Sequence, residues 1–203
     1  MSEKKKVGIL GGTFDPVHIA HLILAESAWQ QFELQTVLIM PSGEPPHKAE
    51  RQISSAEHRI RMIQLAIDDN KHFKLSTVET ERPGATYTAD TLTELCRSNP
   101  DCEYYFIIGA DSLFHIEKWY QPEIIMSHAV LLAAARDELG AEELEARIAY
   151  LKDKYAARIE LLQAPKLPIS SSYIRERVAG KESIRYMVPK DVEKYIYQNE
   201  LYL

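Results

Sequence analysis

The sequence predicts an α/β protein with a doubly wound, Rossmann-like open parallel sheet of five to six strands and helices on both faces. Three observations favour this class. Short apolar runs recur along the chain, segments with helical spacing separate them, and two glycines follow the first run. Strands that are continuously apolar are typical of parallel sheets covered on both faces. We therefore expect one sheet between two helical layers.

Six apolar runs rich in β-forming residues are expected to be the strands. In chain order they are Val7–Leu10, Thr36–Met40, Phe73–Val78, Glu103–Ile108, Ala129–Ala134 and Arg158–Leu162. An order of 3-2-1-4-5 in the sheet would make the first and fourth strands neighbours. Ligands of open parallel sheets bind beyond the carboxyl ends of the strands, at the point where the winding reverses.

Six segments with apolar residues at helical spacing are expected to be helices. They are Ile19–Phe32, Ser55–Ile67, Tyr87–Arg97, Glu142–Tyr155, Ser170–Val178 and Asp191–Gln198. The segments Pro41–Ile53 and Gly109–Lys118 are expected to be loops that close on a ligand. Because no linker or repeat interrupts the chain, residues 1–203 are expected to form a single domain.

Composition restricts the class of protein. The net charge of -6 argues against nucleic-acid binding and suits a protein that handles small anions at a local site. Cys96 and Cys102 fit neither a disulfide framework nor a metal-ligand spacing. No apolar run has the length of a membrane span and no signal peptide opens the chain, so we expect a cytoplasmic protein without membrane partners.

The segment Gly11–His21 carries the strongest functional pattern. A strand, a glycine turn and a helix in this order expose backbone N–H groups and the positive end of a helix dipole, which suits phosphate. His18 and His21 are three residues apart, so both can project from one face of the first helical turn. The histidines could instead cap the helix and pack on Asp15, or form half of a metal site.

Two further turns complete a candidate pocket. Gly109 and Asp111 follow the fourth predicted strand, which would place them across the crevice from the histidines. Ser170, Ser171 and Ser172 precede a predicted helix, with Arg175 one turn in. One serine is expected to cap that helix, and the remaining donors suit a polyphosphate.

Two weaker signals lie elsewhere. Pro45-Pro46-His47-Lys48 predicts a stiff, exposed loop that would close over the crevice. Trp119 is more often a core residue than a flat stacking surface for a ligand ring, and both interpretations stay open. The chain has no P-loop pattern, nucleophile elbow or Cys–His signature, so neither P-loop hydrolysis nor a covalent intermediate is expected.

These motifs together resemble a known family. The segment Gly11–His21 resembles the (T/H)xGH signature of the nucleotidyltransferase superfamily. The similarity extends to bacterial nicotinate-nucleotide adenylyltransferases through motifs that cover nearly the whole chain. These are Pro45-Pro46-His47-Lys48, Tyr87-Thr88-Ala89-Asp90-Thr91, Ile108-Gly109-Ala110-Asp111, Lys118-Trp119-Tyr120, Ile169-Ser170-Ser171-Ser172 with Ile174-Arg175, and Arg185-Tyr186-Met187-Val188-Pro189.

The resemblance implies that ATP and nicotinate mononucleotide give deamido-NAD and pyrophosphate, a step of NAD biosynthesis. It implies catalytic roles for His18, His21 and Arg175. For ATP binding it implies Gly11, Gly12, Phe14, His18, His21, Gly109, Asp111, Ser171, Ser172 and Arg175. For nicotinate mononucleotide it implies Thr13, Lys48, Thr86, Tyr87, Trp119, Tyr120 and Arg136. Mg²⁺ would be held mainly by ATP phosphates and water, without a protein metal site.

Other activities stay open from the sequence. Transfer to nicotinamide mononucleotide or to phosphopantetheine is one alternative, and a non-catalytic nucleotide-binding regulator is another.

The sequence departs from the family pattern at two places. Ala20 replaces the usual glycine of the first signature, and Arg136-Asp137 replaces a common Arg-Pro-Gly. A homodimer is the default expectation for the assembly.

Overall fold

A computed structural model describes residues 4–43, 53–134 and 141–203. Six parallel strands form one sheet in the order β3-β2-β1-β4-β5-β6, which confirms the predicted order and adds β6 at the far edge. The strands are β1 (Lys5–Gly12), β2 (Thr36–Pro41), β3 (Phe73–Leu75), β4 (Cys102–Gly109), β5 (Ala129–Ala134) and β6 (Arg158–Leu162). The predicted fold class is therefore correct.

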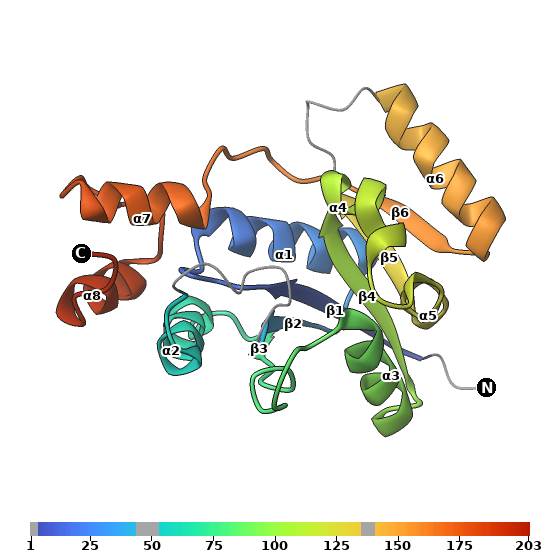
Figure 1. The fold of residues 1–203 in the computed structure, drawn as a ribbon, viewed down its shortest axis with the longest axis horizontal. Helices are drawn as coiled ribbons and strands as arrows, with labels where there is room; N and C mark the ends of the chain where they lie inside the picture. Colours follow the sequence, from blue (N-terminus) through green and yellow to red (C-terminus); the bar gives the residue numbers. More distant parts are fainter. Residues whose placement is uncertain (1–3, 44–52, 135–140) are drawn as a thin grey trace.

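The winding reverses between β1 and β4. Leu10 of β1 pairs with Ile39 of β2 on one side and with Ile107 of β4 on the other. The glycines that end β1 and β4 therefore lie at neighbouring carboxyl ends, where doubly wound sheets bind ligands. In Figure 1, β4 runs steeply across the direction of β1, which shows the twist of the sheet.

The helices agree with the predictions except in one region. They are α1 (Ile19–Phe32), α2 (Ala56–Ile67), α3 (Thr88–Ser98), α4 (Ala110–His115), α5 (Pro122–His128), α6 (Ala141–Tyr155), α7 (Ser171–Ala179) and α8 (Lys190–Gln198). The expectation of a loop at Gly109–Lys118 is wrong, because α4 and a 3-10 turn at Ile116–Lys118 occupy it. Burial of Leu113 and Ile116 in the core holds these short turns helical.

The third strand is shorter than predicted. The expected strand Phe73–Val78 is regular only over Phe73–Leu75, because β3 is an edge strand whose single neighbour is β2. Beyond it, the Ser76 N–H still donates to the Ile39 carbonyl at 3.1 Å before the chain leaves the sheet.

Two apolar layers sandwich the sheet. Helices α1, α2, α7 and α8 bury residues on one face, and α3, α4, α5 and α6 bury residues on the other. Because both faces are covered, β5 is buried at every position, which explains its unbroken apolar sequence. Within the described residues, no helix is both long enough and apolar enough to cross a membrane. That residues 1–203 form one domain stays a prediction.

Candidate active site

The turn after β1 shapes the start of α1. A Cβ atom on Gly12 would lie only 3.2 Å from the ring of Phe14, so glycine lets that ring fold back over the strand end. Phe14 is buried and has a positive φ of 51°. Its ring meets the His21 ring edge-on, with 4.9 Å between centroids. Phe14 therefore belongs to the support of the histidines.

His18 and His21 form a stacked pair at the amino terminus of α1. His18 is the N-cap residue, and the two ring centroids are 3.6 Å apart. The backbone N–H of His18 donates to Nδ1 of His21 at 3.3 Å. The neutral His21 ring therefore carries its proton on Nε2, which makes that atom a donor. Nδ1 of His18 is buried and has no partner within the described structure.

Burial sets the charge state of this pair. Desolvation lowers the pKa of His18 from 6.5 to about 4. Desolvation also lowers the pKa of His21 well below its usual value, and the neighbouring His18 lowers it further. Both rings are therefore neutral at pH 7 in the free protein, and they act as uncharged hydrogen-bond donors until an anion arrives.

The amino terminus of α7 packs against the same turn. Ser170 caps the helix by accepting from the Tyr173 N–H at 3.1 Å, which confirms the expected serine cap. Ser171 Oγ donates to the Pro16 carbonyl at 2.9 Å. Arg175 Nη1 donates to the Asp15 carbonyl at 2.6 Å and Nη2 donates to Ser172 Oγ at 3.4 Å.

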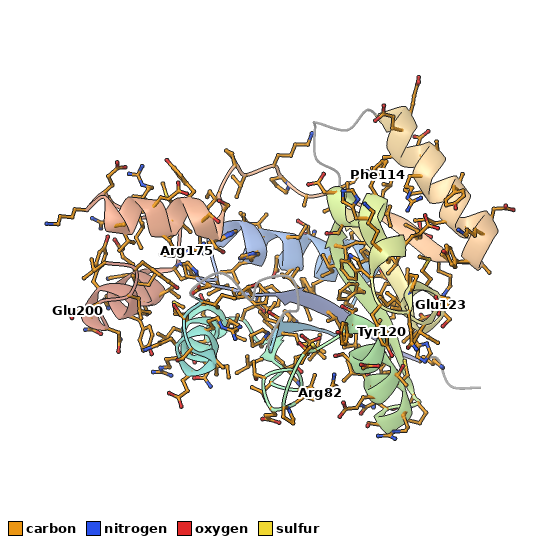
Figure 2. All side chains as sticks on the ribbon, in the orientation of Figure 1. Arg82, Phe114, Tyr120, Glu123, Arg175 and Glu200 are labelled. Atoms are coloured by element: carbon orange, nitrogen blue, oxygen red, sulfur yellow. The ribbon has the colours of Figure 1, made fainter. Side chains whose placement is uncertain are left out.

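These contacts bring together two motifs that are about 155 residues apart in the chain. Figure 2 shows Arg175 projecting from α7 toward the region where α1 begins. We call the assembly of His18, His21, Ser171, Ser172 and Arg175 the histidine side of the site. It combines two helix amino termini with neutral and charged donors, which is an anion-binding arrangement.

Gly109 and Asp111 lie at the neighbouring strand end, as the sheet order requires. Gly109 is the N-cap of α4, and a Cβ atom placed on it would meet no atom within 4 Å. Asp111 is exposed in the first turn of α4. The open space beside Gly109 leaves room for a ligand.

A second group of predicted residues lies around the start of α3 and the turn that follows α4. Thr86 is buried, and Tyr87 is the N-cap of α3. The Tyr87 ring contacts the Tyr120 ring, with 4.7 Å between centroids. Trp119 meets Phe106 edge-on at 6.4 Å and is only partly buried. We call Thr86, Tyr87, Trp119 and Tyr120 the aromatic side.

Trp119 combines the two interpretations that the sequence left open. Part of its ring packs on the core of the α3–α6 face, while the rest stays accessible. Tyr120, labelled in Figure 2, is 48% exposed. A partly buried ring that is anchored on the core suits the stacking of a planar group.

Two predicted residues, Lys48 and Arg136, lie outside the described residues, as do the rest of the Pro45–Lys48 motif and Asp137. Among the residues that the structure describes, no three His, Cys, Asp or Glu side chains group in a way that could hold a metal ion. Asp15, the carboxylate nearest the histidines in sequence, accepts from Tyr202 Oη at 2.7 Å and from the Ser54 N–H at 3.3 Å.

Sequence reasoning missed several supporting residues. Glu79 accepts from Thr91 Oγ1 at 2.9 Å and from Thr86 Oγ1 at 3.4 Å, and burial raises its pKa. Arg59 is 4% exposed and donates to three backbone carbonyls. One signal for Arg59 was present, since it shares the buried face of α2 with Met62 and Ile63 at helical spacing.

Comparison with known proteins gives a consistent family. The Cytidylyltransferase-like family model matches residues 9–177. A probable nicotinate-nucleotide adenylyltransferase of Lachnoclostridium phytofermentans is 49% identical over 98% of this chain and 100% of its own length. The probable nicotinate-nucleotide adenylyltransferase of a Synechococcus species is 43% identical over 99% of this chain and 96% of its own.

A solved structure shares the fold. The Plasmodium falciparum nicotinic acid mononucleotide adenylyltransferase complexed with NaAD matches with a TM-score of 0.80. The alignment covers 98% of this chain and 97% of that chain at 20% identity. The matched model and the full-length relatives show that this chain belongs to the nicotinate-nucleotide adenylyltransferase family of Cytidylyltransferase-like proteins.

Proposed function

We propose that this chain transfers the adenylyl group of ATP to nicotinate mononucleotide, giving deamido-NAD and pyrophosphate in NAD biosynthesis. The observation that carries the proposal is the stacked His18–His21 pair, joined through the Asp15-Pro16 turn to Ser171 and Arg175. The names of the full-length relatives support the same reaction. So does the Plasmodium falciparum enzyme, which was solved with NaAD.

The reaction needs no general base. The nucleophile is a phosphate monoester with a second pKa of about 6, so it is largely dianionic at neutral pH. It requires placement in line with the α-phosphorus of ATP and stabilisation of the charge that develops there. This requirement fits a site that has fixed donors and whose sequence has no nucleophile-elbow or Cys–His signature.

The histidine side supplies those donors. Nε2–H of His21 is oriented by the bond that Nδ1 accepts from the His18 backbone, and His18 contributes a buried ring with an unsatisfied nitrogen. An incoming triphosphate would raise the lowered pKa values of both rings, because a nearby anion favours the imidazolium form. The positive charge on the histidine pair would then stabilise the negative charge that develops in the transition state.

Arg175 and the serines would hold the leaving pyrophosphate. One Arg175 nitrogen already bonds the Asp15 carbonyl and another bonds Ser172, so the guanidinium is held in place before any ligand arrives. The remaining guanidinium donors and the first N–H groups of α7 suit the β- and γ-phosphates. Gly11, Gly12, Gly109 and Asp111 would line the adenosine part.

The aromatic side would receive the pyridine ring of nicotinate mononucleotide. Trp119 would stack on the ring, and backbone N–H groups near Thr86 and Tyr120 would bind the carboxylate. Thr13 lies on the same edge of the sheet, and its carbonyl is held by Arg59 at 3.0 Å. Lys48 and Arg136 remain proposed contacts to the mononucleotide phosphate.

ATP would enter as its magnesium complex. Both carboxylate oxygens of Asp15 are engaged within the protein, so this residue is not arranged to hold the ion. Mg²⁺ keeps several waters and is commonly bound through substrate phosphates. We propose that it arrives with ATP as part of the substrate.

Pyrophosphate release tests the proposal directly. The protein is incubated with MgATP and, separately, with nicotinate mononucleotide, nicotinamide mononucleotide or phosphopantetheine. We expect the fastest release with the nicotinate acceptor. Release only with phosphopantetheine, or ATP binding without turnover of any acceptor, would contradict the proposal.

Two further expectations concern the whole protein. We propose that it acts in the cytoplasm and assembles as a homodimer. Sedimentation of the purified chain measures the oligomeric state directly. We expect a species with twice the mass of one 203-residue chain.

A further inference from the structure

Arg59 is a buried cation whose hydrogen bonds to other described residues end on backbone carbonyls. Its Nε donates to the Ser54 carbonyl at 3.1 Å, and its Nη1 donates to the carbonyls of Thr13 at 3.0 Å and Ser42 at 2.8 Å. The residue is 4% exposed. Burying a guanidinium is costly unless its donors are satisfied, and here the three carbonyls and the charge of Asp15 offset that cost.

Two of the three carbonyls follow strand ends, and the third precedes a helix. Thr13 follows β1, Ser42 follows β2, and Ser54 precedes α2. The Ser42 N–H also donates to the Gly12 carbonyl at 2.8 Å, which extends the pairing of β1 and β2 by one residue. Arg59 thus links the chain segments just beyond the last β1–β2 pair of the sheet.

Two buried polar atoms without partners among the described residues lie in the segments that follow the strands Arg59 joins. Ser42 Oγ and His18 Nδ1 are buried side-chain atoms without a hydrogen-bond partner within the described ranges. Both belong to segments that leave the carboxyl ends of β1 and β2. Buried polar atoms are normally satisfied, so two such atoms at one edge of the sheet mark the place where a polar ligand completes the bonding.

The rest of the turn is held by other groups. Arg175 and Ser171 bind the carbonyls of Asp15 and Pro16 on the α7 side. Arg59 binds Thr13 on the β2 side. The two arginines therefore secure opposite ends of one short turn.

We propose that Arg59 is a positioning residue for the acceptor nucleotide. It fixes the Thr13 and Ser42 backbone so that the mononucleotide phosphate is aligned with ATP, without touching either substrate. The proposal rests on the proposed function. It predicts that loss of the guanidinium fork weakens use of the mononucleotide more than binding of ATP, since the ATP end of the turn keeps its own anchors.

The main test compares Arg59→Lys with Arg61→Lys, a matched change at an exposed arginine on the same helix. Lysine keeps the charge but lacks the planar fork that reaches several carbonyls at once. We expect Arg59→Lys to raise the KM for nicotinate mononucleotide about tenfold or more and to lower kcat, on the scale of a misplaced reactant. The KM for ATP should change less than about twofold, and Arg61→Lys should behave as the wild type.

Two outcomes would overturn the proposal. One is unchanged kinetics in a folded Arg59→Lys protein, and the other is an equal rise in both KM values. If Arg59→Lys does not fold, Arg59→Gln is subjected to the same kinetic comparison, because glutamine keeps donors without the charge.

A readout without turnover separates this proposal from the proposed function. The Ser42 amide should exchange its hydrogen faster in Arg59→Lys than in the wild type, because the strand end that it closes is released. Wild-type protein that turns over no mononucleotide would defeat the proposed function. An unchanged rate of hydrogen exchange at the Ser42 amide in the variant would contradict the positioning role of Arg59, whatever the activity.

Discussion

The histidine side and the aromatic side of the site are held by different kinds of contact. On the histidine side, Ser171 and Arg175 of α7 donate to the carbonyls of the Asp15-Pro16 turn. The His21 ring accepts from the His18 backbone N–H. On the aromatic side, rings meet rings at 4.7 Å and 6.4 Å, and Tyr120 is half exposed.

This difference follows from what each side has to recognise. Charge that develops at phosphorus is stabilised by donors that are fixed in advance, since reorganisation during the reaction would cost free energy. A planar ring is recognised by a flat surface, which tolerates small shifts. Substitutions on the histidine side should therefore affect kcat, and substitutions on the aromatic side should affect the KM of the acceptor.

Replacing His18 gives the largest expected effect. His18→Ala should lower kcat about a hundredfold or more, the scale of losing one preorganised donor, while the protein stays folded. The KM for the acceptor should change little. Steady-state pyrophosphate release and a thermal melt measure both quantities, and an unchanged kcat would remove His18 from the catalytic group.

The lowered pKa of His18 predicts a pH-dependent contribution to stability. Because the pKa falls from 6.5 to about 4 on folding, the unfolded chain binds the proton more readily. The contribution is complete above pH 6.5 and is lost as the pH falls toward 4. At pH 5 the loss relative to neutral pH amounts to roughly 2 kcal/mol, from the difference between the two pKa values.

The comparison variant is His18→Asn, which keeps an N-cap residue without a titrating ring. Urea unfolding between pH 7.5 and 4.5 should show a smaller loss of stability in His18→Asn than in the wild type. Parallel curves for the two proteins would show that burial does not suppress ionisation of this ring.

Replacing Trp119 tests whether the aromatic side determines the KM for the acceptor. Trp119→Ala should raise the KM for nicotinate mononucleotide by about tenfold, the scale of losing one aromatic contact, and leave the KM for ATP nearly unchanged. Trp119→Phe is the matched control, because it keeps a flat ring at the same place. A fall in kcat with no change in the acceptor KM would break the division between the two sides.

Most of the fold was predictable because its signals are local. Helix α1 has the predicted bounds of Ile19–Phe32, since its apolar spacing and its start after a glycine turn agree. Helices α4 and α5 have only six and seven residues, too few for a periodic pattern to show. Their helical form depends on core contacts of Leu113 and Ile125, which are set by the tertiary fold.

The site divides in the same way. His18, His21 and Arg175 could be selected from motifs, because the chemistry of phosphate binding requires those residue types beside helix starts. Arg59 and Tyr202 bind groups far away in the sequence, and Glu79 binds a threonine of α3, so no local pattern assigns their partners. Of these three residues, only Arg59 has a signal in the sequence, because it is a charged residue on an otherwise apolar face of α2.

Tyr202 gives the smallest expected effect and shows how far the support of the histidine side extends. Its hydroxyl donates to the buried Asp15 carboxylate at 2.7 Å, so the last residues of the chain hold the turn that precedes His18. Tyr202→Phe removes one donor, while Asp15 keeps its bond from the Ser54 N–H. We expect a loss of about 1 kcal/mol in the free energy of unfolding.

Urea unfolding of Tyr202→Phe beside Tyr197→Phe, a change at an exposed tyrosine on α8, measures this loss. If the histidine side is held rigidly by many contacts, kcat should fall only about twofold, since Arg175 and Ser171 still bind the same turn. A large fall in kcat with unchanged stability would mean the opposite. The turn would then depend on a single distant hydroxyl, and the histidine side would be no more firmly fixed than the aromatic side.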